Sequence, residues 1–136
     1  MNKSRLPTIQ EIEELTYFLP RLYAAGFSPI DIWSGGEKLK DGSFTLPYPN
    51  YNPLVEEFFR TVSSSWLDYE YNPEQAYQML KDENAVKTAS LPQIKSLLTF
   101  CVRGERFSDG HWGEMIEKGY IRRILERLNE IKSQLK

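Results

Sequence analysis

The side chains best suited to chemistry are concentrated in one short segment, residues 103–112. They are two arginines, two carboxylates, the single histidine of the chain and a tryptophan: Arg103, Arg106, Glu105, Asp109, His111 and Trp112. Guanidinium groups hold carboxylate or phosphate through paired hydrogen bonds, and an imidazole or carboxylate beside them can move protons. If these side chains meet in one cleft, they form a site for a small anionic ligand or substrate.

The same segment also has a purely structural interpretation. Arg103 and Arg106 would stand at the end of a helix, where cations complement the helix dipole. Ser108 or Asp109 would cap the next helix, and Phe107 would anchor the corner in the core. An imidazolium is disfavoured at a helix N-terminus, so we expect a mainly neutral His111 near pH 7. The residues alone leave both interpretations open.

Other candidates for chemistry in the sequence are weaker. No nucleophile is clearly paired with His111, and one histidine with one cysteine does not supply the usual ligands of a zinc site. We therefore expect neither a metal nor a cofactor. Cys101 falls on the apolar face of a predicted helix and is expected in the core. A single cysteine excludes an intramolecular disulfide and favours a reducing, cytoplasmic location.

Charge and hydropathy restrict the partners of the chain. The net charge is -2 and the pI is about 5.5, which argues against nucleic acid as a partner because such binding needs a basic face. Residues 93–136 nevertheless carry nine Lys/Arg against six Asp/Glu, so weak nucleic-acid association through Arg122, Arg123 and Arg127 is a third-ranked alternative. No apolar run approaches the roughly 18 residues of a membrane span, so no membrane association is expected.

Helical patterns cover most of the chain outside one insert. Capping and apolar spacing predict helices after Thr8, Asn52, Asn72 and Ser90, with a break in the first of them at Pro20. Two more helical segments cover residues 112–119 and 120–135. We expect a mainly α-helical, single compact domain over residues 1–136, with about five helices. Residues 27–51 form an irregular insert or a short β-hairpin that pairs 31–33 with 43–46.

Two apolar features favour a protein partner. The last helix carries a continuous seam, which either completes the core or meets a partner: Ile121, Ile124, Leu125, Leu128, Ile131 and Leu135. A second group of aromatic residues is expected partly in the core and partly on a recognition surface: Tyr48, Tyr51, Trp66, Tyr69, Tyr71 and Tyr77.

Three places in the sequence carry a resemblance to a known family. They are the run from Leu46-Pro47-Tyr48 to Tyr51-Asn52-Pro53, the run from Arg103 to Phe107, and Gly110-His111. With them the chain resembles DUF6508, a family of uncharacterised bacterial proteins, over most of its length. The resemblance implies one intact domain and assigns no activity.

Together these observations favour a non-enzymatic binding or interaction module. It would associate with a protein partner or with a second copy, as a homodimer formed through the C-terminal helix. The alternative is a small hydrolase or transferase that acts on an anionic substrate at the 103–112 junction.

Overall fold

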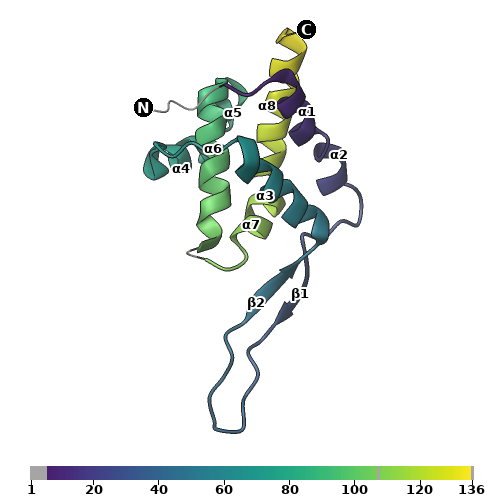
Figure 1. Ribbon diagram of the computed structural model, residues 1–136, viewed down its shortest axis with the longest axis vertical. Helices are drawn as coiled ribbons and strands as arrows, with labels where there is room; N and C mark the ends of the chain where they lie inside the picture. Colours follow the sequence, from purple (N-terminus) through teal and green to yellow (C-terminus); the bar gives the residue numbers. More distant parts are fainter. Residues whose placement is uncertain (1–5, 107, 136) are drawn as a thin grey trace.

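Helices form the body of the molecule in the computed structural model, and a two-stranded arm projects from one end of it (Figure 1). The structure describes residues 6–106 and 108–135. In chain order the elements are α1 (Ile9–Thr16), α2 (Leu19–Leu22), β1 (Ile30–Ser34), β2 (Tyr48–Tyr51), α3 (Pro53–Ser65), α4 (Pro73–Lys81), α5 (Glu83–Lys87), α6 (Leu91–Arg103), the 3-10 helix η1 (Gly104–Arg106), α7 (His111–Glu117) and α8 (Tyr120–Leu135). Within these ranges α1, α3, α4, α6 and α8 have eight or more residues, which agrees with the predicted mainly α-helical domain.

Side-chain caps explain where the longer helices begin. At α1 the Thr8 hydroxyl accepts a hydrogen bond from the Glu11 backbone N–H, and the Glu11 carboxylate accepts one from the Thr8 N–H. A second capping box of this kind opens α6. Asn52 and Asn72 each precede a proline and accept hydrogen bonds from the first turns of α3 and α4. These four predicted helix starts are confirmed, and each such cap typically contributes about 1 kcal/mol.

The first helix is broken, as predicted. Helix α1 ends at Thr16, and Pro20 lies in the first turn of the short helix α2, where its missing N–H costs no hydrogen bond. Helix α5 was not predicted. Its N-cap is Asp82, whose carboxylate accepts hydrogen bonds from the backbone N–H groups of Asn84 and Ala85.

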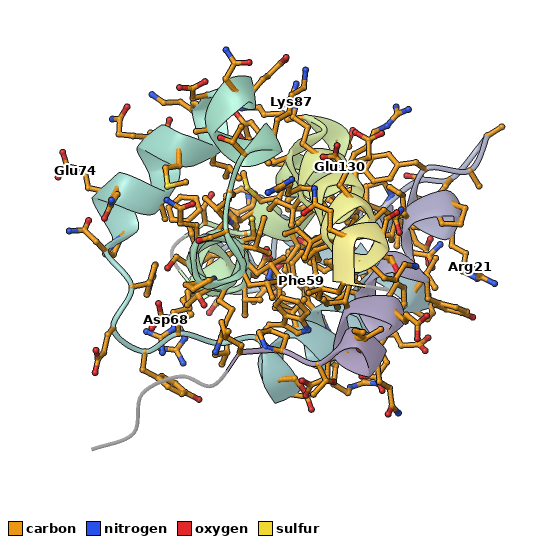
Figure 2. All side chains as sticks on the ribbon, turned by 90° about the horizontal axis from the view of Figure 1, so that it is seen from above. Arg21, Phe59, Asp68, Glu74, Lys87 and Glu130 are labelled. Atoms are coloured by element: carbon orange, nitrogen blue, oxygen red, sulfur yellow. The ribbon has the colours of Figure 1, made fainter. Side chains whose placement is uncertain are left out.

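The core is rich in aromatic side chains. Phe58, Phe59 and Trp66 of the α3 region are almost completely buried. Figure 2 shows Phe59 near the centre of the helical body, while the charged side chains of Arg21, Glu74 and Lys87 lie toward its edge. None of the helices in the described ranges combines the length and the apolar character that a membrane span requires.

Helix α8 supplies the other main part of the core. It packs against α1, α5 and α7, and five residues of its apolar seam are buried: Ile121, Ile124, Leu125, Leu128 and Ile131. Only Leu135, at the end of the seam, is exposed. The seam is therefore used inside the domain, and α8 presents no continuous apolar face on which the predicted self-association could rest.

Tyr23 fixes the turn between α7 and α8. Its hydroxyl donates a hydrogen bond to the Ile116 carbonyl over 2.8 Å and accepts one from the Arg122 N–H over 2.9 Å. One side chain thus satisfies the C-terminus of α7 and the N-terminus of α8. Gly119 makes the turn between the two helices at φ +84°, as its predicted role as a helix C-cap requires.

The projecting arm, residues 30–51, is an antiparallel hairpin in which Ile30 faces Tyr51 and Ser34 faces Tyr48. The predicted hairpin is thus present, but the predicted second strand, residues 43–46, is wrong. Beyond Ser34 the chain turns at Gly35, whose backbone lies directly against the Leu46 carbonyl. Beyond this point residues 36–39 and 43–45 are joined by irregular backbone hydrogen bonds and one bridge. The regular strand that pairs with β1 is therefore Tyr48–Tyr51.

A β-bulge decides which side chains of the arm face the helices. Ile32 lies opposite Asn50, which leaves Asp31 as an extra residue in β1. In a regular strand Ile30 and Trp33 would point to opposite faces, whereas the bulge places them on the same face. Both side chains meet α7. A methyl group added to Gly113 would lie 3.0 Å from Ile30, and one added to Gly110 would lie 3.0 Å from Trp33. The base of the arm is therefore seated on the first turn of α7.

Candidate functional site

Glu105 is the structural centre of the 103–112 segment. Helix α6 ends at Arg103, η1 reverses the chain, and α7 begins after Gly110. The Glu105 carboxylate accepts hydrogen bonds from the Gly110 N–H (3.0 Å), the Trp112 N–H (2.9 Å) and the Tyr51 hydroxyl (2.7 Å). Its two oxygens therefore cap α7 and also bind the base of the arm. Burial and this carboxylate raise the pKa of Tyr51.

The predicted cap of α7 by Ser108 or Asp109 is wrong. The N-cap position is Gly110, at φ +89°, and it has no side chain that could accept a hydrogen bond. Glu105 replaces that cap from the preceding 3-10 turn, which a search for a local capping residue cannot detect. Asp109 is exposed and makes no hydrogen bond or ion pair with the described residues. Phe107, the predicted anchor of the corner, lies outside those residues.

His111 is half-buried in the junction, with its ring packed against neighbouring residues. The ring meets Phe100 edge-on at a centroid distance of 5.7 Å. Its Nε2 atom is buried with no hydrogen-bond partner among the described residues, and it lies against Gly104, at a point where a Cβ would overlap the ring. Burial lowers the pKa of His111, and the nearby Glu105 and Glu114 carboxylates offset this only in part. The predicted neutral imidazole agrees with this direction, although burial, and not the helix dipole, is its main cause.

Trp112 mainly connects the junction to the core. Its ring stacks on Phe59 at 4.7 Å and lies 5.3 Å from the Tyr51 ring. The indole N–H donates to the Val102 carbonyl over 3.0 Å. One side of Trp112 remains at the surface, where it lines a cleft with Arg103 and Arg106.

Two adjoining hollows share these arginines, and we call them together the arginine cleft. The larger has a volume of about 440 Å³ and is lined by Ser63, Leu67, Tyr69, Val102, Arg103, Glu105, Arg106 and Trp112. The smaller has about 260 Å³ and is lined by Tyr71, Pro73, Phe100, Arg103, Gly104 and Arg106. The cleft thus lies between the α6–α7 junction and the connection from α3 to α4.

Aromatic rings surround one of the two arginines. The Arg103 guanidinium carbon lies 5.4 Å from the centre of the Tyr69 ring and 5.6 Å from that of the Tyr71 ring, within the range of cation–π attraction. Arg106 is exposed beside it. Neither guanidinium forms an ion pair with a carboxylate of the described residues. The cleft therefore combines two guanidinium groups that are free of ion pairs within the described residues with a flat wall formed by the rings of Tyr69 and Tyr71.

The structure thus separates the six predicted site residues into groups. Arg103, Arg106, Glu105 and Trp112 line one cleft, His111 packs behind it and Asp109 lies outside its lining. Sequence reasoning placed Tyr69 and Tyr71 in an aromatic cluster but did not connect them with Arg103, because more than thirty residues separate them along the chain. The cluster itself is divided, since Trp66 is buried whereas Tyr48, Tyr69 and Tyr77 are exposed.

Groups suited to other chemistry lie elsewhere or are inaccessible. Cys101 is completely buried, and burial raises the pKa of its thiol. Across residues 6–106 and 108–135, no three histidine, cysteine, aspartate or glutamate side chains are grouped to hold a metal ion. A more open hollow of about 630 Å³ lies between α1 and α3, and its lining includes Glu13, Glu14 and Glu57. That hollow is acidic, in contrast to the arginine cleft.

Comparison with known proteins identifies a family. No curated protein and no solved structure matches the chain. A family model does match, over residues 7–134, and is described as a family of unknown function, DUF6508. This range contains the arm, the 103–112 junction and nearly all of α8, and it agrees with the resemblance noted in the sequence. The chain belongs to the DUF6508 family.

Proposed function

We propose that the protein is a non-enzymatic binding module and that its arginine cleft takes a small organic anion. The charged group, a carboxylate or a phosphate, would bind to Arg103 and Arg106, whose guanidiniums offer paired donors to such groups. A flat apolar part of the same ligand would lie against Tyr69 and Tyr71.

The observation that carries this proposal is that, within residues 6–106 and 108–135, no carboxylate forms an ion pair with either arginine. Glu105 lies between them in sequence, but its carboxylate is directed to three donors on α7 and β2. It cannot turn toward the guanidiniums without leaving the backbone N–H groups of Gly110 and Trp112 without an acceptor, at a cost of about 1–3 kcal/mol for each group. The positive charge of the cleft is therefore available to a ligand.

The surroundings of the ionisable groups favour binding over catalysis. The His111 Nε2 atom lies against the Gly104 backbone, whereas a general base must reach the proton that it removes. The Cys101 thiol is buried and its pKa is raised, whereas a nucleophilic cysteine needs a lowered pKa and access to its substrate. A hydrolase or transferase acting on an anion remains the alternative that the experiments below must separate from binding.

The first experiment is a titration of the full chain with phenyl phosphate, in which two-dimensional NMR monitors the chemical shifts of the protein. The probe joins a dianionic group to one aromatic ring, and inorganic phosphate and neutral benzyl alcohol test each half alone. The indole N–H of Trp112 is a reporter in the cleft wall. We expect saturable shifts with phenyl phosphate, weaker binding of inorganic phosphate, and no saturation with benzyl alcohol.

The matched variants are Arg106→Ala and Arg60→Ala. Both remove an exposed arginine, but Arg60 lies in the hollow between α1 and α3. Loss of one charge-assisted contact should weaken phenyl phosphate binding by roughly tenfold or more in Arg106→Ala and leave Arg60→Ala unchanged. Equal effects of the two substitutions, or no saturable binding to the wild type, would reject the proposal. Release of phosphate from the probe during the titration would favour the enzymatic alternative.

A further inference from the structure

The arm exposes an unusual amount of apolar surface. Of the eleven large hydrophobic side chains that are exposed in the described part of the chain, six belong to the arm: Ile32, Trp33, Leu39, Phe44, Leu46 and Tyr48. Leu46 is 83% exposed and Phe44 is 65% exposed. The first turn of α7 lies against one side of Trp33, and Figure 1 shows that the outer part of the arm extends away from the helices.

The inner end of the arm packs on the helical body, whereas its outer part projects from it. Ile30, Trp33 and Tyr51 hold the base of the hairpin on α7 and Glu105. Beyond Ser34 the two chain segments are joined to each other through the bridge between Lys38 and Phe44 and the turn around Gly42. An isolated two-stranded ribbon is only marginally stable in water and needs packing on one face.

The exposed apolar area of the arm reaches the lower limit for a biological interface. The six side chains together expose on the order of 700 Å² if a large side chain offers about 200 Å². If two thirds of this area were covered, two partners would bury roughly 1,000 Å² in total, about the lower limit for a biological interface. The largest apolar patch of an ordinary monomer measures about 300–600 Å².

The charges of the arm indicate which partner fits it. The arm carries acidic residues, Asp31, Glu37 and Asp41, and basic residues, Lys38 and Lys40. This mixture offers no positive surface to nucleic acid or to an anionic membrane. It is self-complementary instead. In a twofold contact each residue meets the surface that the other copy also offers, so the lysines of one tip can face the acidic groups of the other.

Backbone pairing between strand edges is a less suitable way to join two arms. Pro49 has no N–H and interrupts the outer edge of β2. The bulge at Asp31 disturbs β1 and places a charge there, and both features are known to discourage edge pairing. Contact between apolar side chains is the other way to join two arms. Ile32 and Tyr48 share the face of the arm that is turned away from α7, and the exposed side chains of Leu39, Phe44 and Leu46 lie farther out along the arm.

We propose that the arm is the interface between two copies of this chain, which pack their arms together around a twofold axis. The arms would bury Phe44 and Leu46 against the second copy and stabilise each other's ribbon. This interface does not involve the α8 seam, which is used in the core, and it does not depend on ligand binding at the arginine cleft.

The test is sedimentation of the full chain at concentrations from about 1 µM to about 1 mM. The wild type should reach twice the monomer mass of 15.9 kDa. Phe44→Glu with Leu46→Glu should raise the dissociation constant of the dimer by about a hundredfold or more, as expected for apolar anchors in an interface. Both side chains are exposed in the monomer, so circular dichroism should show unchanged helix content.

Leu135→Glu is the matched control, because it places the same charge at an exposed leucine at the end of α8. It should leave the dimer intact. A wild type that stays monomeric over the whole range overturns the proposal. So does a dimer that survives the double substitution, or one that Leu135→Glu dissociates.

An introduced cysteine gives a second readout. Cys101 is buried, so Leu46→Cys supplies one accessible thiol per chain. Under mild oxidation the arms should form a disulfide between two copies, whereas Tyr77→Cys, at an exposed site on α4, should not. Equal crosslinking at the two positions would count against a specific arm interface.

Discussion

Alanine in place of Gly104 is the most direct test of the packing at the 103–112 junction. Gly104 has φ -60° and ψ -24°, an ordinary helical conformation that alanine adopts without strain. At such a position Gly→Ala usually stabilises a protein by about 0.4–1 kcal/mol, because it restricts the unfolded chain. Here the new methyl group would overlap the His111 ring. Glycine is therefore required by the neighbouring side chain and not by the backbone.

The size of the effect follows from these two opposing contributions. The His111 ring must leave its place beside Phe100, and overpacking of this kind costs about 1–3 kcal/mol. When His111 is also alanine, the space is open and the usual stabilisation of about 0.4–1 kcal/mol returns. The two substitutions should therefore be coupled by roughly 1.5–4 kcal/mol in a double-mutant cycle.

The assay is urea unfolding of the wild type, Gly104→Ala, His111→Ala and the double variant. Far-ultraviolet circular dichroism monitors the loss of helix at each urea concentration. Equal m-values would show that the four proteins unfold from comparable states. In thermal unfolding, a loss of 1 kcal/mol should lower the Tm by about 4 °C. The reasoning is refuted if Gly104→Ala stabilises the wild type, or if its effect is the same with and without His111.

Other parts of the structure support further predictions. Tyr51→Phe removes one of the three donors to Glu105 and should lower the free energy of unfolding by about 1–2 kcal/mol; an unchanged urea midpoint would contradict that role. Tyr23→Phe removes the link between α7 and α8 and should lower the free energy of unfolding by about 1–3 kcal/mol. Backbone amides at the start of α8 should then exchange hydrogen faster, and unchanged protection of these amides would contradict the prediction. Because burial lowers the pKa of His111 in the folded protein, the imidazole is protonated at a higher pH in the unfolded chain than in the folded one. The wild type should therefore lose stability relative to His111→Ala as the pH falls below about 6.5, and parallel pH profiles would exclude this. The Cys101 thiol should react with a thiol reagent only after unfolding, and fast labelling of the native protein would show that it is accessible.

Short-range features of this fold were predictable because they depend on residues close together in the chain. A cap such as Thr8 with Glu11 acts within one helical turn, so its geometry is already specified by spacing. The same holds for Asn52 before Pro53 and for Gly119 at the end of α7. The apolar periodicity of α8 likewise identified its buried side, although it could not say whether that side meets the same chain or another one.

The second strand of the arm shows where local patterns are insufficient. Residues 43–46 and residues 48–51 both contain the aromatic side chains that favour strands. The choice depends on Gly35 meeting the Leu46 carbonyl and on the bulge at Asp31, which turns Ile30 and Trp33 together toward α7. Both are contacts between distant segments, so spacing within one segment does not reveal them.

By itself the sequence determined the helical class, most helix starts and the segment in which charged groups gather. Only the tertiary structure decided what each of those groups does. Glu105 caps α7 because η1 turns its carboxylate toward Gly110 and because Tyr51 arrives from β2. Arg103 faces Tyr69 because the connection from α3 to α4 passes beside the end of α6. Hydrogen bonds and ring contacts act over a few ångströms, and residues distant in sequence come within that range only when the chain has folded.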